Sequence, residues 1–471
     1  MALAVAISAL LTLALEVFST RLFAVLLWKN AASAILSLAL LGIGVSGALV
    51  YLRPTWFPRE RRHAQVAWAL VAFGVSIVAS YLMLLALSRS PRSEMEPLSH
   101  FVPLVLAGML PFCVGGLVLT IVFTHEADLP RLYRIDLVSA AVGAVLVLPA
   151  LSALNGPPLV PALAAVAAIG ALILAHREKL QGPRNAAVGL LVALGALSAV
   201  HAETGLLRVT HSHGTADGPI ELERWGPLAR MTVRPHSSAS KWLDIDSQVV
   251  TAVLRFSGDP DDVDYLRKSV LQLAYHLRPF ESVLVIGPGG GSDVLAALTS
   301  GAKDITAVEV NPTTVGIMRG ELSNYTGGLY DRPEIHVHVA DGRAYVASMR
   351  ERVDLLQATF VDTFTAQASG AHTLSENYLY TVEGFGDFLD HLREDGVLSM
   401  SRWGGEAYTF AEVHRSVAIA RDALDRRGVT NPGEHVVVVQ GAPPEKLTLG
   451  GGYLHQAGNS ESMSTLLVKT S

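Results

Sequence analysis

Long apolar runs fill the first 202 residues of the chain. Runs without a charged residue cover 31–52, 66–88, 101–124, 137–154, 157–175 and 186–202. A bilayer core of about 30 Å is crossed by about 20 apolar residues in a helix that rises 1.5 Å per residue. Residues 1–28 form a further apolar stretch, so we expect six or seven spans. The pattern predicts a multi-spanning α-helical membrane domain at 1–202.

Two charged residues, Glu16 and Arg21, interrupt the first apolar stretch. On a helix they lie about 140° apart, so they are not expected to pair tightly. In one interpretation Arg21 extends its charged end to the membrane surface and Glu16 faces another helix. In the other, they are functional charges inside the membrane. Because further apolar runs follow at once, we do not interpret residues 1–28 as a cleaved signal peptide.

After residue 202 the apolar residues occur in short runs separated by turns. Residues 203–260 alternate apolar and polar positions, which predicts a small β subdomain. Residues 261–471 alternate short apolar runs with helical stretches, which is typical of a doubly wound, mostly parallel α/β sheet. The expected strands are 283–287, 305–309, 335–339, 355–358 and 397–400, with 436–440 and 466–469 closing a seven-stranded sheet as an antiparallel pair.

The charge distribution distinguishes the two parts of the chain and limits the classes of partner that the protein can bind. Only 17% of the residues are charged, against roughly a quarter in soluble proteins. Residues 1–202 carry a net charge of +5 and residues 203–471 carry −11. The acidic second part argues against nucleic acid as a partner, since phosphate binding needs clustered Lys and Arg. The single cysteine, Cys113, excludes a disulfide scaffold and a thiolate cluster, and we expect no metal site.

The basic residues of the connections predict an orientation that conflicts with the rest of the pattern. Nine Lys and Arg lie in 53–65, 125–136 and 176–185, against three in the other connections. The positive-inside rule places these three connections and the N-terminus in the cytoplasm. Seven full spans would then place the second part outside. We nevertheless expect the second part in the cytoplasm, because the ligand inferred below is cytosolic. One segment would then not cross the membrane, and 186–202 is the weakest candidate for a span.

A glycine-rich loop follows the first strand of the expected α/β sheet. Glycines at every second position allow the backbone to turn tightly and to approach a ligand closely. Glu309 follows 22 residues after Gly287, at the end of the second strand, where an acid accepts the ribose hydroxyls of a nucleoside. Asp341 ends the third strand and is suited to accept an adenine amino group. The expected nucleoside-binding residues are Gly287, Gly289, Gly291, Asp293, Glu309, Asp341 and Gly342.

The run Val283–Pro312 resembles the nucleotide half of the spermidine synthases, the polyamine aminopropyltransferases. The resemblance covers about 225–471, and the multi-spanning N-terminal part is similar to membrane-bound bacterial members. It implies the fold of class I S-adenosylmethionine-dependent methyltransferases. It also implies that the chain binds S-adenosylmethionine or decarboxylated S-adenosylmethionine, with the glycine loop, Glu309 and Asp341 in the corresponding positions.

The sequence departs from this family at the acceptor side. The family's fourth strand ends in an aspartate that deprotonates the attacking amine, and Thr359 occupies that position here. The family's Tyr-His-Glu amine-binding motif should fall near Tyr265, where the histidine and glutamate are absent. The loop after the fourth strand retains acids and tyrosines that can act as general base or cover a substrate. The expected catalytic residues are Asp362, Glu376 and Tyr378.

We therefore expect a membrane-anchored transferase that moves an alkyl group, foremost an aminopropyl group, to a small-molecule acceptor such as a polyamine. One alternative is an S-adenosylmethionine-dependent methyltransferase, which Thr359 favours. The other is a non-catalytic membrane sensor or transporter with a nucleotide-binding regulatory domain. The lipid bilayer is the expected surrounding of 1–202, and the pattern leaves self-association open.

Overall fold

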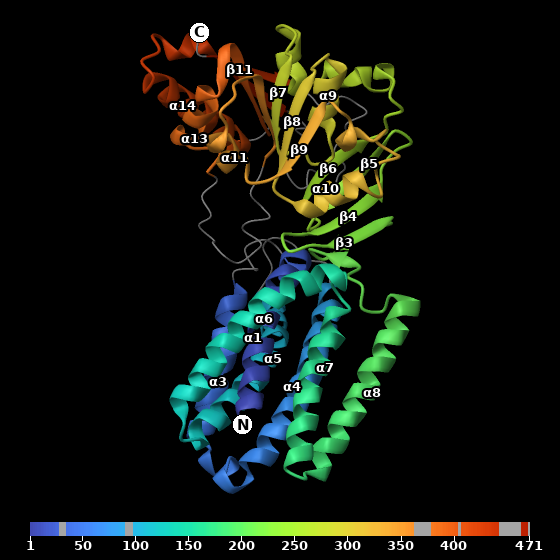
Figure 1. Ribbon diagram of the computed structural model, residues 1–471, viewed down its shortest axis with the longest axis vertical. Coiled ribbons are helices and arrows are strands. Elements are labelled where there is room, and N and C mark those ends of the chain that lie inside the picture. Colours follow the sequence, from blue (N-terminus) through green and yellow to red (C-terminus); the bar gives the residue numbers. More distant parts are fainter. Residues whose placement is uncertain (28–33, 90–97, 362–377, 404–406, 442–462, 470–471) are drawn as a thin grey trace. The chain divides into compact units, whose positions relative to one another are not determined.

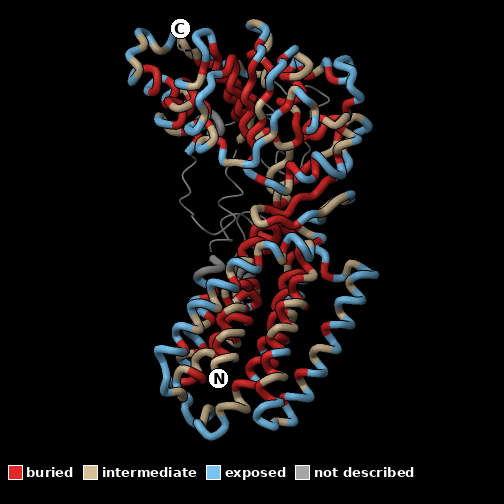
Figure 2. Tube along the Cα trace, in the orientation of Figure 1, coloured by how far each residue is buried: buried red, intermediate tan, exposed pale blue. Residues whose placement is uncertain are grey.

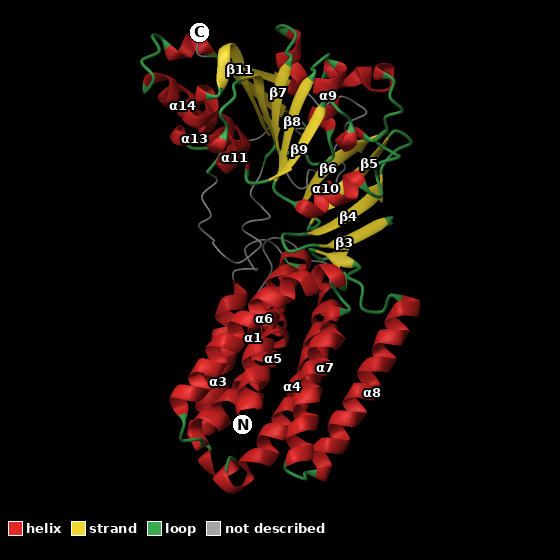
Figure 3. Ribbon diagram, viewed as in Figure 1, coloured by secondary structure: helices red, strands yellow, loops and turns green. Residues whose placement is uncertain are grey.

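The computed structural model describes residues 1–27, 34–89, 98–361, 378–403, 407–441 and 463–469. The described residues form two compact units. The helical unit contains those of Met1–Gly218 and Glu223–Arg230. The α/β unit contains those of Pro219–Leu222, Met231–Thr363 and Ser375–Ser471. Figure 3 shows that long helices make up the first unit and that the strands of the main sheet belong to the second.

The helical unit is a bundle of long apolar helices (Figure 1). Its first helix, α1, contacts α3, α4, α5, α6 and α7 and therefore lies at the centre of the bundle, whereas α8 packs on α7 and α4. Apolar residues surround these helices on all sides, as expected for membrane spans or for the core of a large protein. The helices are α1 (Ala2–Leu26), α3 (Ala34–Leu52), α4 (Arg62–Ser88), α5 (Leu98–His125), α6 (Leu129–Ala153), α7 (Leu159–Arg177) and α8 (Gln181–Thr204).

Six helices among the described residues are long and apolar enough to cross a membrane. They include Gln181–Thr204, a helix of 24 residues over the segment that the sequence ranked weakest. The others are Ala2–Leu26, Pro54–Ser88, Val102–His125, Leu129–Ala153 and Leu159–Arg177. By length and composition α8 can therefore cross as well, although it is the least apolar of the six helices, as the sequence predicts.

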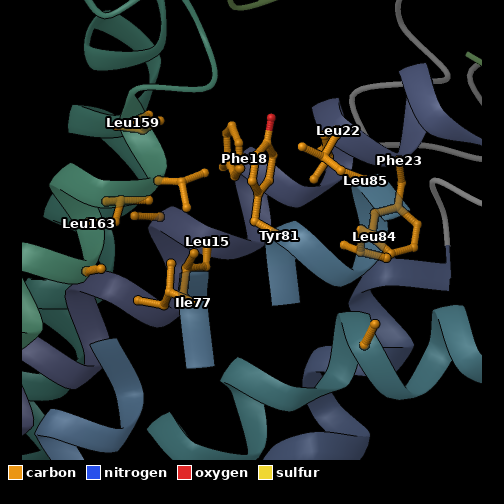
Figure 4. Packing of buried hydrophobic residues seen from close by; sticks show 14 of the residues in the cluster. Leu15, Phe18, Leu22, Phe23, Ile77, Tyr81, Leu84, Leu85, Leu159 and Leu163 are labelled. Carbon is orange, nitrogen blue, oxygen red and sulfur yellow. The ribbon is translucent and has the colours of Figure 1, made fainter. Parts of the chain in front are cut away.

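A segment that follows α8 packs against one end of the helical bundle. The Tyr81 hydroxyl in α4 donates to the carbonyl oxygen of Leu207 at 2.6 Å, and its ring lies 6.3 Å from that of Phe18 in α1 (Figure 4). Arg21 near the end of α1 is buried and donates to the carbonyl oxygen of Leu228. These contacts fix the segment to α1 and α4, and they give Arg21 a structural role.

Arg230 is the largest fully buried side chain among the described residues. Its guanidinium donates to Asp217 at 2.8 Å, to Glu223 at 2.7 Å and to the carbonyl oxygen of Val209 at 3.1 Å. The Trp225 indole donates to the same Glu223 carboxylate at 2.9 Å. Two carboxylates thus compensate one buried cation, which ties together chain segments on both sides of the short strands β1 (His211–Ser212) and β2 (Thr215–Ala216).

The α/β unit contains a seven-stranded sheet with the order β12-β13-β11-β10-β7-β8-β9. Five neighbouring strands run parallel, and β13 is antiparallel to both β11 and β12. This confirms the predicted mostly parallel sheet closed by an antiparallel pair. The strands are β7 (Ser282–Ile286), β8 (Asp304–Glu309), β9 (Ile335–Val339), β10 (Val353–Thr359), β11 (Leu392–Trp403), β12 (Val436–Gly441) and β13 (Met463–Val468).

The central strands of this sheet are buried on both faces (Figure 2). Every residue of β7 is buried, because helices cover the sheet on either side, and this explains its continuous apolar run. The helices of the unit are α9 (Ser292–Thr299), α10 (Pro312–Arg319), α11 (Gly342–Ser348), α13 (Val382–Asp390) and α14 (Ala407–Asp425).

A smaller sheet precedes the main one, as the alternating pattern predicts. Its order is β3-β4-β5-β6, with antiparallel pairs from β4 to β6. The strands are β3 (Leu222–Trp225), β4 (Arg230–Pro235), β5 (Ser240–Ile245) and β6 (Val249–Leu254). Two segments of 3-10 helix, Pro260–Lys268 and Val270–His276, which the sequence pattern did not predict, join it to β7.

Candidate nucleoside site

The glycine loop lies between the end of β7 and the first residue of α9, as predicted. Gly287, Gly289 and Gly291 have φ angles of +66°, +51° and +85°. This left-handed region is costly for residues with a Cβ. A Cβ on Gly290 would lie 2.2 Å from the carbonyl oxygen of Ala252 in β6. The run of glycines is therefore required both by the turn and by the strand that lies against it.

Hydrogen bonds hold this loop in place from two sides. The Gly290 amide donates to the Thr251 hydroxyl at 3.1 Å, and the Ser292 hydroxyl donates to the carbonyl oxygen of Ala252 at 3.1 Å. On the other side, the Tyr330 hydroxyl donates to the carbonyl oxygen of Gly289 at 2.8 Å. The loop is thus pre-formed by contacts within the α/β unit.

Glu309 ends β8 directly beside the loop. One carboxylate oxygen accepts the Gly289 amide at 3.1 Å and the other accepts the Asn311 amide at 2.9 Å. The side chain is only 7% exposed, and its burial raises the pKa although the backbone donors lower it. Because each carboxylate oxygen can accept more than one hydrogen bond, the group retains capacity for donors such as ribose hydroxyls.

Asp341 and Gly342 follow β9, the next strand in the sheet. Asp341 is exposed and caps α11 by accepting the Ala344 amide at 2.8 Å. A Cβ on Gly342 would lie 2.5 Å from Ile286 Cγ2, so the third strand end packs tightly against the first. The structure thus brings the ends of β7, β8 and β9 to one edge of the sheet, where ligands of open α/β sheets bind.

Asp293 lies in the first turn of α9 and is buried with 7% exposure. Its carboxylate accepts hydrogen bonds from Gln272 Nε2 at 3.1 Å and from the Thr359 hydroxyl. Burial raises its pKa, and these two hydrogen bonds oppose the shift. Asp293, which the sequence predicts to bind the nucleoside, therefore contacts Thr359 at the end of β10.

Sequence reasoning missed the amides that surround Asp293. Gln357 Nε2 donates to Gln272 Oε1 at 3.3 Å, and the Tyr275 hydroxyl donates to Gln357 Oε1 at 2.8 Å. The available signal was Gln357 itself, a polar residue inside the apolar run of β10. No spacing rule connects it to residues 272 and 275, which lie in the unpredicted 3-10 segment.

Two of the three expected catalytic residues, Asp362 and Glu376, lie outside the described residues. Tyr378 is described and 59% exposed, and its carbonyl oxygen accepts from Arg343 at 3.1 Å. Nearby, the Tyr380 hydroxyl donates to the carbonyl oxygen of Val361 at 3.0 Å and accepts from Arg402 at 3.2 Å.

The described residues contain no group of three or more His, Cys, Asp or Glu side chains that could hold a metal ion. Glu309 and Asp341 present carboxylates at two neighbouring strand ends, beside the glycine loop, the buried Asp293 carboxylate and the Thr359 hydroxyl.

The chain is similar to curated polyamine aminopropyltransferases. It is 26% identical to that of Korarchaeum cryptofilum over 226 residues, covering 45% of this chain and 66% of the relative. It is 31% identical to polyamine aminopropyltransferase 1 of Pseudomonas aeruginosa over 143 residues, covering 30% of this chain and 46% of the relative. The match thus spans about half to two thirds of these relatives' length. No protein-family model matches the chain.

Among solved structures, the chain is similar to spermidine synthase from Thermotoga maritima. The TM-score is 0.37 at 16% identity, covering 54% of this chain and 73% of that one. A spermidine synthase solved with the transition-state analogue AdoDATO has a TM-score of 0.37 at 15% identity, covering 54% of this chain and 72% of that one.

Proposed function

We propose that the protein is a membrane-anchored aminopropyltransferase. It would move the aminopropyl group of decarboxylated S-adenosylmethionine to a small amine, as in polyamine biosynthesis. The observation that carries the proposal is the Glu309 carboxylate fixed against the Gly289 amide at the edge where three strands end. Similarity to polyamine aminopropyltransferases, including one from Korarchaeum cryptofilum, supports the reaction type.

The residues of the edge fit a nucleoside. Glu309 is buried, is already oriented by two backbone amides, and would accept the ribose hydroxyls. Asp341 is exposed at the next strand end and would accept the adenine amino group. Four of the five residues 287–291 are glycines, so the backbone of this loop can come close to a ligand.

The donor supplies a sulfonium, which already carries a good leaving group. The protein then has two tasks, which are to align the amine with the reacting carbon and to take up one proton. Asp362, Glu376 and Tyr378 remain the proposed residues of the acceptor side. The acceptor itself would be a small amine whose charge is matched by acidic side chains.

A second candidate is methyl transfer from S-adenosylmethionine. The observation that favours it is Thr359, which places a hydroxyl instead of a carboxylate at the end of β10. An acceptor that is already deprotonated needs no base there. Ligand binding without turnover would instead indicate a membrane sensor or transporter with a regulatory nucleoside site.

We also propose that the apolar helices of the helical unit anchor the chain in the membrane and that the α/β unit faces the cytoplasm, where the donor is made. The positive-inside rule places the basic connection 176–185 in the cytoplasm as well. Both ends of α8 would then lie on the same side, so α8 would not cross the membrane.

Calorimetry and turnover of the purified full-length chain test the function. We expect tighter binding of decarboxylated S-adenosylmethionine than of S-adenosylmethionine, and release of a thioether nucleoside when a diamine is added. Preference for S-adenosylmethionine together with a methylated product would replace the proposal by methyl transfer. Failure to bind either nucleoside would refute both.

A further inference from the structure

A cluster of polar side chains, most of them buried, includes Asp293 just after the glycine loop, and the nucleoside contacts proposed above do not use it. We call it the Asp293 cluster; its members are Asp293, Thr359, Gln272, Gln357 and Tyr275. They come from α9, β10 and the 3-10 segment Val270–His276, all within the α/β unit. Gln272 and Gln357 are at most 3% exposed, and Thr359, at the carboxyl end of β10, is partly exposed.

The hydrogen bonds of the cluster run in one direction. Tyr275 donates to Gln357 Oε1 at 2.8 Å, and Gln357 Nε2 donates to Gln272 Oε1 at 3.3 Å. Gln272 Nε2 then donates to Asp293 at 3.1 Å. Each amide uses its oxygen as acceptor and its nitrogen as donor, so the sequence of donors ends on the Asp293 carboxylate.

Thr359 closes the cluster on the side of the sheet edge. Gln357 Nε2 lies 3.5 Å from Thr359 Oγ1, and the Thr359 hydroxyl is hydrogen-bonded to the Asp293 carboxylate. The hydroxyl therefore contacts a buried carboxylate, and its residue is partly exposed at the carboxyl end of β10. That arrangement lets a hydroxyl pass a proton inward while it receives another from outside.

A buried carboxylate without an ion pair is costly for the fold. Among the described residues, Asp293 has amide and hydroxyl donors but no salt bridge. The titratable groups that face it are Tyr275 and Tyr330, whose pKa values burial raises well above the ordinary value, so both are neutral. Glu309 acts on Tyr330 from the end of β8. A sulfonium bound at the sheet edge would bring the missing positive charge.

We propose that Thr359 is the group that takes the proton from the acceptor amine and that Asp293 is the positioning residue behind it, which receives the Thr359 hydroxyl proton. The proposal rests on the proposed aminopropyl transfer. It deepens that function by naming a proton path where the expected aspartate is replaced by threonine.

The step balances in atoms and charge. The amine lone pair forms the C–N bond while the C–S bond breaks and leaves its electron pair on sulfur, which becomes a neutral thioether. The ammonium proton moves to Thr359 Oγ1, and the Thr359 hydroxyl proton moves to the Asp293 carboxylate. A sulfonium and a carboxylate thereby become two neutral groups, and Asp293 later returns its proton to water.

Turnover of four variants tests the path. Asp293→Asn keeps the shape but accepts no proton, so kcat should fall by about 10²–10⁴-fold with donor affinity nearly unchanged. The acidic limb of the pH–rate profile should disappear with it, which loss of packing alone would not cause. Thr359→Val should lose as much as Asp293→Asn, and Thr359→Ser should keep most activity. The double variant Asp293→Asn with Thr359→Val should lose no more than either single one, because the two act as a unit.

A control variant and a comparison with the other proposed base show whether the loss of turnover is specific to this path. Asp304→Asn changes an exposed aspartate at the opposite end of β8 and should leave turnover as it is. Asp362→Asn changes the other proposed base, and it should lose less turnover than Asp293→Asn and keep the acidic limb. If Asp293→Asn were fully active, or its pH–rate profile kept the acidic limb, the Asp293 path would be overturned.

A binding measurement decides the proposal even without turnover. In calorimetry with two buffers of different ionisation enthalpy, the positively charged donor should lower the pKa of Asp293 and release protons, whereas the neutral thioether nucleoside should not. Asp293→Asn should abolish this difference. If the wild type binds the donor but transfers nothing to any amine, the proposed function fails. Proton release equal in the wild type and in Asp293→Asn would overturn the role of Asp293.

Discussion

The carboxylate of Glu309 accepts the backbone amide of Gly289 at 3.1 Å. The acid at the end of β8 and the loop after β7 therefore form one rigid unit within the α/β fold. Because the carboxylate is oriented by the fold, a nucleoside would not have to order it on binding, and less conformational entropy is lost.

The first prediction concerns this pair. Glu309→Ala should weaken binding of the donor nucleoside by about 1.5–3 kcal/mol, the range for hydrogen bonds to charged groups. Calorimetry measures the affinity, and a thermal unfolding scan shows whether the loop remains folded. Glu281→Ala removes an exposed glutamate of the same unit, which pairs with exposed Lys303, and should change neither. Unchanged affinity in Glu309→Ala would remove Glu309 from the site.

The second prediction concerns the close approach of Gly342 to Ile286. Gly342→Ala places a methyl group against Ile286 Cγ2, and we expect a loss of about 1–3 kcal/mol of stability, as for an overpacked core. Gly316→Ala is the matched control, since no atom lies within 4 Å of the added carbon. It sits within α10 and should be neutral or stabilising by up to about 1 kcal/mol. Denaturant unfolding of both variants measures the difference. Equal stability of the two would show that the third strand end is loosely packed.

The third prediction concerns the buried Arg230. Arg230→Met leaves the carboxylates of Asp217 and Glu223 without their cation, so we expect a loss of about 3–5 kcal/mol. Arg421→Ala breaks an exposed pair with Asp425 and should cost at most about 1 kcal/mol. Thermal unfolding in detergent compares them. A small effect of Arg230→Met would mean that water or rearranged side chains satisfy both acids.

The fourth prediction uses two aspartates whose pKa values are shifted in opposite directions. Burial raises the pKa of Asp293 above its ordinary 3.8, so its contribution to stability is lost as the pH rises through the folded-state value. At Asp354 burial also acts to raise the pKa, but the Ser282 and Glu281 amides and Arg393 lower it overall. Its contribution is therefore lost as the pH falls.

Melting temperatures measured against pH should show these signs. Relative to the wild type, Asp293→Asn should gain stability as the pH rises above 3.8, whereas Asp354→Asn should lose stability as the pH rises toward 3.8 from below. The same sign for both variants would contradict the assignment of one of the two environments.

The fifth prediction concerns membrane orientation. If the α/β unit uses a cytosolic donor, a reporter fused after Ser471 should be active only inside the cell. The basic residues of 176–185 and the 24-residue length of α8 argue for the opposite result. A second reporter within 176–185 tests the two ends of α8 directly. Activity of the Ser471 reporter outside the cell would refute the cytoplasmic placement.

Features that depend on neighbouring residues could be predicted from the sequence, whereas features that depend on residues far apart in the chain could not. The strands and the glycine loop could be predicted because apolar runs and φ-positive glycines are properties of a few consecutive residues. The Asp293 cluster could not, since Gln272 and Gln357 are 85 positions apart and meet only in the folded sheet.

Arg230 shows the same limit in the helical unit. The alternating pattern of 203–260 does not single out Arg230, but the side chain is 1% exposed and pairs with Asp217 and Glu223. The segment Pro260–His276 was missed because 3-10 turns lack the periodicity that identifies an α-helix.

The hydrogen bond between Tyr380 and Val361 has a consequence for how far the chain between them can change in length. It joins two points on either side of residues 362–377 and belongs to the same unit as β10. Lengthening a loop between two fixed ends costs little, only about 0.6 kcal/mol for each doubling. The number of residues between Val361 and Tyr380 can therefore change at little cost to the α/β unit. If the proposed acceptor residues Asp362 and Glu376 act as we propose, the choice of acceptor can change while Glu309 keeps its position beside the glycine loop.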